Sequence, residues 1–87
     1  MIWHSRRFDL SVRLTRHARE RMAQRGVSQD EVADVVETGS VRRKDARRLW
    51  IYKAIPGRDD NLVCVAVAQE DMLIVKTIMT HWQVEEP

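Results

Sequence analysis

The sequence has little of what several common classes of protein need. Its 87 residues include one cysteine, Cys64, which excludes an internal disulfide and a cysteine-rich zinc site. No apolar run approaches the roughly 18 residues that span a bilayer. The first charged residues are not followed by the apolar segment of a signal peptide. These absences predict one soluble cytoplasmic domain over residues 1–87, with a core of about residues 8–82.

The sequence also lacks the residue spacings that are typical of metal sites and of nucleotide-cofactor sites. The three histidines, His4, His17 and His81, do not have the spacing of metal ligands. No glycine-rich loop is present that could hold the phosphates of a nucleotide. We therefore expect neither a metal nor a cofactor.

What the sequence does contain is an uneven distribution of charge. Residues 1–58 carry 14 of the 15 Lys and Arg but only 7 of the 13 Asp and Glu, a local charge of +7. The remaining residues carry a local charge of −5. A basic segment of this kind is typical of phosphate binding, which favours nucleic acid, RNA before DNA, as the partner. The alternative is a solvated face whose arginines serve solubility alone.

The first third of the chain predicts a strand followed by a helix. Apolar and polar residues alternate from Phe8 to Leu14, the period of a short strand. Thr15 can cap a helix that runs through Arg25, and Gly26 can end it in the left-handed conformation.

A second helix and several strands should follow. Ser28 and Glu31 form a capping box, and the valine-rich helix that they start ends before Gly39. Strand-like segments cover residues 41–44, 48–54, 62–68 and 72–80. The order predicts an α+β domain in which two N-terminal helices, preceded by a short strand, pack on a three- to four-stranded antiparallel sheet.

The first predicted helix carries the most suggestive side chains. His17, Arg21 and Arg25 are spaced four residues apart and line one ridge beside the apolar stripe. Arginine suits a phosphate because its fork offers two parallel donors, and histidine exchanges a proton near neutral pH. The alternative is that all three are ordinary exposed helix residues.

The last predicted strand contains a hydroxyl group that could belong to a functional site. Thr77 lies among apolar neighbours, where its hydroxyl needs a partner or faces a cleft. Strict alternation puts Lys76 on the opposite face from Thr77.

Cys64, in an apolar run, is expected in the core. The tryptophans fit either base stacking or core packing; they are Trp3, Trp50 and Trp82.

Two segments resemble a widespread bacterial domain family of unknown function. Residues 15–28, with Glu31-Val32 after them, resemble its opening signature of Thr or Ser, His-Ala, Arg-Met and Arg-Gly-Val-Ser. Residues 73–78 are similar to its closing strand, with a Val-x-Thr-Ile core. The resemblance covers about residues 14–80; its opening motif is fairly specific and its closing motif is weak alone. It implies a relation to RelE-, ParE- and BrnT-like toxins, which carry two N-terminal helices against an antiparallel sheet.

This resemblance implies a metal-independent ribonuclease that is encoded beside an antitoxin. Such an enzyme moves a proton from the RNA 2′-OH, neutralises the crowded phosphate and protonates the leaving 5′-oxygen. His17 is the candidate general base or acid, Arg21 holds the phosphate and Thr77 donates a hydrogen bond to it. A second acid–base group would have to come from His81 or Tyr52. Further candidate nucleic-acid contacts are Arg25, Arg58, Lys76, Arg42, Arg43 and Lys44.

Two other interpretations remain open on the sequence alone. The first is a non-catalytic module that binds nucleic acid through the same basic residues, with salt-sensitive binding but no turnover. The second is a protein-interaction domain in which the basic segment 42–48 receives an acidic partner. A toxin also needs a protein partner, so this interpretation overlaps with the enzyme.

Overall fold

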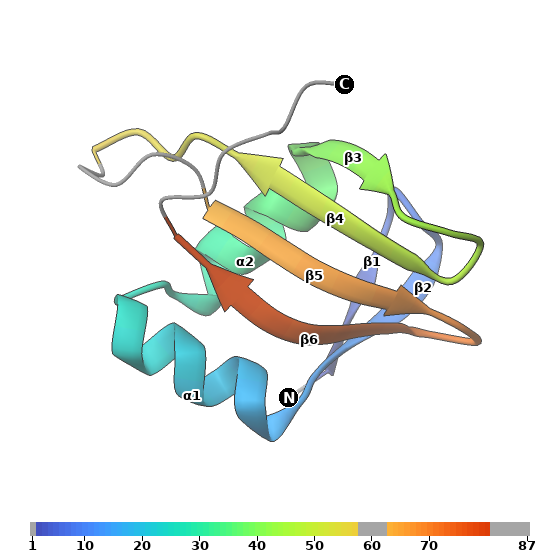
Figure 1. The fold of residues 1–87 in the computed structure, drawn as a ribbon, viewed down its shortest axis with the longest axis horizontal. Helices are drawn as coiled ribbons and strands as arrows, with labels where there is room; N and C mark the ends of the chain where they lie inside the picture. The colour runs from blue at the N-terminus through green and yellow to red at the C-terminus, as the bar shows by residue number, and fades with distance from the viewer. Residues whose placement is uncertain (1, 58–62, 81–87) are drawn as a thin grey trace.

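The computed structural model describes residues 2–57 and 63–80, and this part of the chain forms two helices and six strands. In chain order they are β1 (Ile2–Ser5), β2 (Leu10–Leu14), α1 (Arg16–Arg25), α2 (Gln29–Thr38), β3 (Ser40–Arg43), β4 (Arg48–Lys53), β5 (Val63–Gln69) and β6 (Leu73–Met79). The strands belong to one sheet with the order β1-β2-β6-β5-β4-β3 (Figure 1).

Both helices begin and end where the sequence predicts. The Thr15 hydroxyl accepts a hydrogen bond from the Ala18 backbone N–H, and Gly26 ends α1 with a φ of 63°. Ser28 and Glu31 form the reciprocal capping box at the start of α2. These signals act within three or four residues, so the sequence alone determines them.

The prediction of a three- to four-stranded antiparallel sheet is wrong. The described strands form a six-stranded mixed sheet, because β2 pairs in parallel with β6 while the other neighbours are antiparallel. Strand β1 was not predicted; it pairs with β2 in a short N-terminal hairpin. Alternation along residues 8–14 identifies a strand but cannot identify its partner, which here lies about 60 residues further along the chain.

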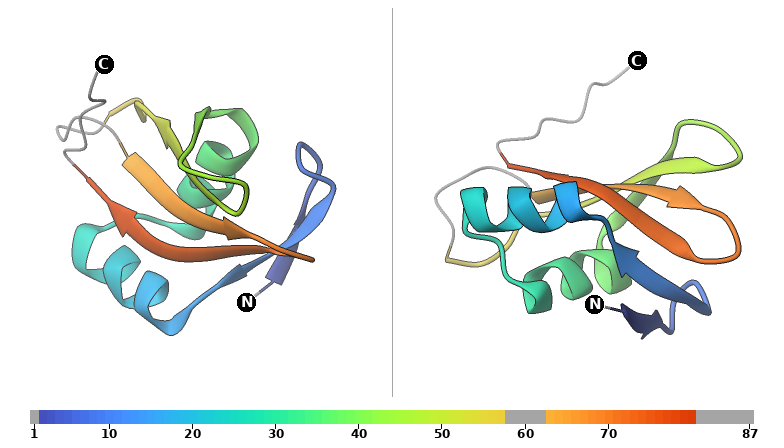
Figure 2. Two further views of the ribbon diagram at one scale, coloured as in Figure 1. Left: turned by 45° about the vertical axis from the view of Figure 1, so that its right-hand side comes forward. Right: turned by 90° about the horizontal axis from the view of Figure 1, so that it is seen from below.

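The core lies between one face of this sheet and helix α2. Val32, Val35 and Val36 are fully buried on one side of α2, at helical spacing. They pack with the inward-facing side chains of the sheet, which include Val12, Leu49, Ile51, Val65, Val67, Leu73, Val75 and Ile78. Figure 2 shows that both helices lie on the same side of the sheet. We call the other side of the sheet the outer face.

Helix α1 lies along the part of β6 that β2 does not cover. Strand β2 pairs with residues Leu73 to Val75 only, and α1 runs beside the rest of β6 (Figure 1). At the junction, the Thr15 N–H donates to the Val75 carbonyl and the Thr15 hydroxyl donates to the Lys76 carbonyl, each at 3.2 Å. Thr15 therefore caps the helix and joins it to the strand at once.

The N-terminal hairpin is attached to the end of α2 by polar contacts around the buried Ser5. The Ser5 hydroxyl donates to Glu37 at 2.6 Å, and the Arg6 N–H donates to the other carboxylate oxygen at 2.7 Å. An Arg7 guanidinium nitrogen donates to the Gly39 carbonyl at 2.6 Å. Burial alone would raise the pKa of Glu37, but these hydrogen bonds and the nearby Arg7 charge lower it overall.

Candidate nucleic-acid interface

The sheet register places three rows of side chains on the outer face. Directly paired residues point to the same side of a sheet, so one row runs from Arg42 through Trp50 and Ala66 to Thr77. The neighbouring rows are Ser40, Tyr52, Cys64 and Met79, and Arg48, Ala68 and Ile74. Trp50 thus lies in the middle of the outer face, half-buried, with small alanines beside it.

A bulge in β6 brings Lys76 and Thr77 to this same face. Thr77 pairs with Ala66 while Val75 pairs with Val67, so Lys76 is an extra residue without a partner across the ladder. The prediction that Lys76 and Thr77 point to opposite faces is therefore wrong, because strict alternation fails at a bulge. Lys76 is exposed and Thr77 is half-buried.

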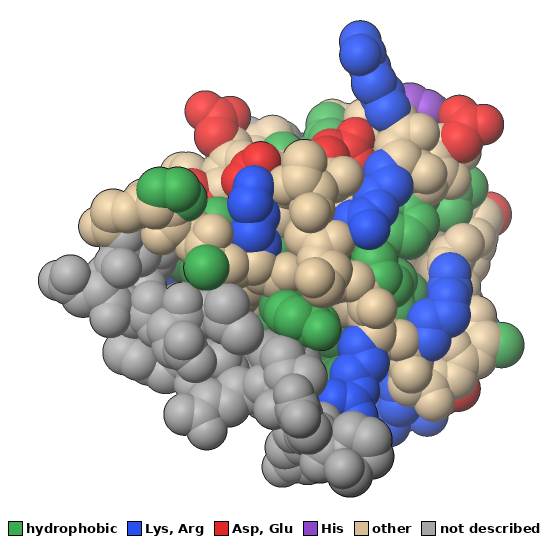
Figure 3. Space-filling model, turned by 90° about the horizontal axis from the view of Figure 1, so that it is seen from above, with side chains coloured by type: hydrophobic (Ala, Val, Ile, Leu, Met, Phe, Trp, Pro, Cys, Tyr) green, Lys and Arg blue, Asp and Glu red, His purple; other side chains and the backbone are tan. Residues whose placement is uncertain are grey.

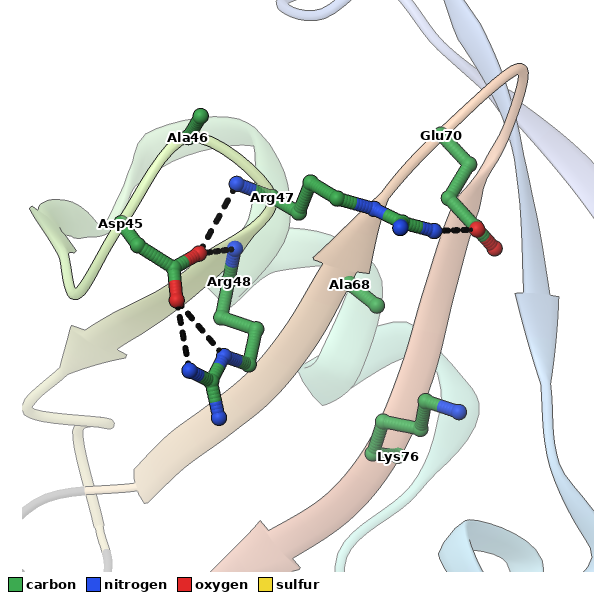
Figure 4. A pocket seen from close by; sticks show the side chains of 7 residues that line it. All are labelled: Asp45, Ala46, Arg47, Arg48, Ala68, Glu70 and Lys76. Carbon is green, nitrogen blue, oxygen red and sulfur yellow. Dashed lines mark hydrogen bonds and ion pairs between the residues drawn. The ribbon is translucent and has the colours of Figure 1, made fainter.

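Two adjoining cavities lie on the outer face. The smaller has a volume of about 240 Å³, and its lining includes Trp50, Ala66, Lys44 and Lys76. The larger, of about 500 Å³, is lined by Asp45, Ala46, Arg47, Arg48, Ala68, Glu70 and Lys76 (Figure 4). Lys76, Arg48 and Ala68 line both, so the two cavities form one groove. Three cationic side chains border the smaller cavity, namely Lys44, Arg48 and Lys76.

Acidic side chains neutralise part of the positive charge around this groove. Arg48 forms an ion pair of 2.6 Å with Asp45, whose carboxylate also accepts the backbone N–H groups of Arg47 and Arg48. The Arg48 side chain, followed by these backbone donors, lowers the pKa of Asp45 to about 2. Arg47 forms an ion pair with Glu70. Both guanidiniums are therefore already engaged.

Lys44 and Lys76 differ from these arginines, because neither forms an ion pair with another residue in the described ranges. On the face seen in Figure 3, Lys and Arg side chains lie among acidic and hydrophobic ones without forming one unbroken patch. The strongest unneutralised charge of the groove therefore comes from the two lysines.

The predicted ridge on α1 exists, and its members contact one another or the end of β6. The Arg21 Nε donates to His17 Nε2 at 3.4 Å, and an Arg21 Nη donates to Gln24. Arg25 donates to the Thr80 hydroxyl at 3.3 Å. His17 is exposed and Arg21 is half-buried. The imidazole of His17 and the guanidinium of Arg21 therefore lie side by side on α1.

The structure does not bring His17 and Thr77 into direct contact. Among the described residues, no hydrogen bond joins His17 to Thr77 or to Lys76. The link is indirect: Thr15 begins the helix that carries His17, and its hydroxyl is bonded to the Lys76 carbonyl. The start of α1 is therefore fixed at the bulge of β6.

The other predicted contact residues have different surroundings. Arg42 lies on the outer face opposite Trp50, while Arg43 donates to the Gln69 side chain at 2.8 Å. Tyr52 is also on the outer face, two residues from Trp50 along β4. Arg58 and His81 lie outside the described residues, as does Trp82.

Sequence reasoning missed the residues that shape the groove. These residues belong to loops or strand ends: the basic run from 42 to 48 signalled Asp45, Arg47 and Arg48, and nothing in the sequence signalled Glu70. The alanines of β5 were read as part of an apolar core strand. Cys64 is buried as predicted, but it lies on the outer-face side and not in the main core cluster.

The described residues lack two features, a cluster of metal ligands and a membrane-spanning helix. No group of three or more His, Cys, Asp or Glu side chains in residues 2–57 and 63–80 could hold a metal ion. Neither described helix is long and apolar enough to cross a membrane.

Comparison with known proteins places the chain in a family without an assigned activity. Residues 14–80 match the model of a domain of unknown function, DUF4258. No curated protein and no solved structure matches the chain. The matched residues begin at the end of β2 and extend through Thr80, so they include α1, the groove and the bulge of β6. Because this match spans most of the sequence, the chain belongs to the DUF4258 family.

Proposed function

We propose that this domain binds RNA in the groove of its outer face and cleaves it without a metal, as the toxin of a toxin–antitoxin pair. The observation that carries the binding proposal is a pair of lysines beside Trp50 in one cavity, Lys44 and Lys76, which form no ion pair within residues 2–57 and 63–80. Such a combination fits a nucleic-acid strand, because lysines attract phosphates and an indole stacks on a base.

The shape of the groove supports the same proposal. Ala66 and Ala68 present only methyl groups beside the indole of Trp50, which leaves the cavity of about 240 Å³. A flat base can enter a space of this size, while the flexible lysines on its border follow the backbone of the strand. An acidic protein partner would also be attracted by the lysines, but it would not need the recess beside Trp50.

The cleavage proposal depends on α1. In the free protein the Arg21 Nε–H donates to His17 Nε2 at 3.4 Å. With RNA bound, Arg21 would turn this donor to the phosphate and stabilise the charge that develops there, which would free His17 Nε2 to accept the proton of the 2′-OH, and a proton from solvent would go to the leaving 5′-oxygen. The Thr77 hydroxyl would contact a neighbouring phosphate oxygen. The relation to RelE-, ParE- and BrnT-like toxins that the family resemblance implies supports this chemistry. It also supports an antitoxin protein as the partner.

Binding is tested first, with purified protein and a 5′-labelled single-stranded RNA followed by fluorescence anisotropy. We expect Lys76→Gln and Lys44→Gln each to weaken binding and to lower the slope of log K against log salt by about 0.7. Arg6→Gln is the matched control, because Arg6 lies on the β1–β2 turn, away from the groove. If all three variants behave alike, binding follows net charge and the groove has no special role.

Cleavage is tested with the same RNA in the presence of EDTA, and by induction in a bacterial host with growth and RNA integrity as readouts. We expect the wild type to fragment RNA and stop growth, and His17→Ala to do neither while it still binds RNA. His4→Ala is the control, since His4 is an exposed histidine that pairs with Asp9 on the N-terminal hairpin. If the wild type itself binds RNA and does not fragment it, the domain is a non-catalytic RNA-binding domain instead.

A further inference from the structure

The larger cavity continues the groove beyond the lysine pair. Its lining includes Lys76 and Arg48 from the smaller cavity and adds Arg47, Asp45 and Glu70. A strand that contacts Lys76 and continues along the face would next meet Arg47 and Glu70. Figure 4 shows the Arg47 side chain extending across the cavity from the β3–β4 loop towards Glu70.

Two loops meet at this end of the groove. The Gln69 N–H donates to the Arg47 carbonyl at 2.6 Å, and the Arg43 guanidinium donates to the Gln69 side chain. The backbone of the β3–β4 loop is therefore held against the start of the β5–β6 loop whether or not Arg47 contacts Glu70. The Arg47 side chain can change its partner without separating the loops.

The two carboxylates in this cavity are held very differently. Asp45 accepts two backbone N–H groups, at 2.9 and 2.8 Å, in addition to the Arg48 side chain. It is therefore fixed as part of the turn that starts β4. The Glu70 carboxylate has one hydrogen-bond partner among the described residues, the Arg47 guanidinium. The Arg47 side chain is 69% exposed and the Glu70 side chain 38% exposed, so both are reached by solvent. The Glu70 carboxylate can therefore leave Arg47 at little cost in free energy, whereas the Asp45 carboxylate cannot leave Arg48 without breaking the turn.

We infer that the larger cavity is a subsite for a phosphodiester group of the bound RNA, and that Glu70 takes the place of that phosphate at Arg47 in the free protein. This inference rests on the proposed RNA binding. A guanidinium binds a carboxylate and a phosphate with the same fork of N–H donors, so one anion can replace the other directly. In the free protein, Glu70 keeps Arg47 extended over the cavity, in the orientation that a phosphate requires.

Exchange of this kind has a measurable consequence. RNA must displace Glu70, so the ion pair opposes binding by the amount that it stabilises the free protein. Exposed pairs are weak, and removal of the competing carboxylate should tighten binding by about two- to fivefold. Removal of Arg47 should weaken binding, and once Arg47 is absent the identity of residue 70 should no longer matter.

The test compares Glu70→Gln with Asp71→Asn in the full chain, with the single-stranded RNA and anisotropy assay described above. Both changes remove one negative charge from the same loop, but Asp71 is exposed and contacts no described basic group. We expect Glu70→Gln to bind more tightly than Asp71→Asn by about two- to fivefold. We also expect this advantage to vanish in an Arg47→Gln background, as a double-mutant cycle measures directly.

Each other outcome refutes a different statement. Equal gains for the two loop variants would mean that only long-range charge acts, and would overturn the subsite while RNA binding stands. A gain for Glu70→Gln that persists without Arg47 would overturn it as well. If the wild type shows no salt-dependent binding of RNA at all, the proposed function fails, and the subsite fails with it.

Discussion

The connection between α2 and β3 makes a strong prediction about Gly39. Its φ of −72° is ordinary for any residue, so the need for glycine comes from space and not from backbone conformation. A Cβ at this position would lie 2.5 Å from the Val35 carbonyl oxygen and 2.8 Å from that of Tyr52, whereas ordinary contacts begin at 3.4 Å. Both obstacles are backbone atoms, in α2 and in β4, and neither can rotate away.

The cost of Gly39→Ala follows from this geometry. Overpacking costs about 1–3 kcal/mol, and relief of the clash would stretch the 2.8 Å bond from the Gly39 N–H to the Val35 carbonyl, which contributes about 1 kcal/mol. Lower entropy of the unfolded chain offsets about 0.4–1 kcal/mol. We expect a net loss of about 2 kcal/mol, which lowers the Tm of a domain of this size by about 8–16 °C.

Gly26 provides the control, because glycine is needed there for the backbone conformation and not for lack of space. A Cβ there would meet nothing within 4 Å, but its φ of 63° is left-handed. Gly26→Ala should therefore cost about 1–2 kcal/mol, and Gly26→Asn should recover much of it, since asparagine tolerates this conformation. Gly39→Asn should recover nothing. The measurement is urea unfolding followed by circular dichroism, and a Gly39→Ala variant within about 0.5 kcal/mol of the wild type would refute the steric argument.

Three more predictions concern single residues. Thr15→Ala should lower the free energy of unfolding by about 1–2 kcal/mol, because α1 loses its cap and its bond to the Lys76 carbonyl, while Thr15→Ser should keep most of it; equal urea midpoints for both variants would contradict this role. The lowered pKa of Glu37 means that its contribution to stability is present above the ordinary value of 4.5 and is lost as the pH falls through the folded-state pKa. The stability difference between wild type and Glu37→Gln should accordingly shrink below pH 4.5, and a constant difference would disprove the linkage. Burial raises the pKa of Cys64 to about 12, so iodoacetamide at pH 8 should label the thiol only after unfolding, and rapid labelling of native protein would disprove its burial.

The sequence predicts the helices well and the sheet poorly, for a physical reason. Thr15, Gly26 and the Ser28–Glu31 box act on neighbouring residues, so the boundaries of both helices can be read locally. The partner of β2 and the existence of β1 depend on contacts between distant segments. A local pattern carries no information about which of several strands will become neighbours.

In the candidate site, too, local features could be predicted from the sequence and contacts between distant segments could not. Lys44 and Lys76 were recognisable as basic residues, but their meeting beside Trp50 depends on the order of β4, β5 and β6. The bulge at Lys76 could not be predicted, because it reverses the alternation that the sequence suggests. Arg47 and Glu70 are 23 residues apart, and nothing in the sequence pairs them.

The position of β6 in the sheet also determines when the domain can fold during its synthesis. Strand β6 lies between β2 and β5, yet it is the last of the described strands to leave the ribosome. Until it emerges, the N-terminal hairpin and the β3–β5 meander are not joined in one sheet, and α1 has no strand to pack against. The nascent chain therefore cannot acquire its outer-face groove stepwise; the two parts of the sheet join, and Lys76 reaches Trp50, in one late event.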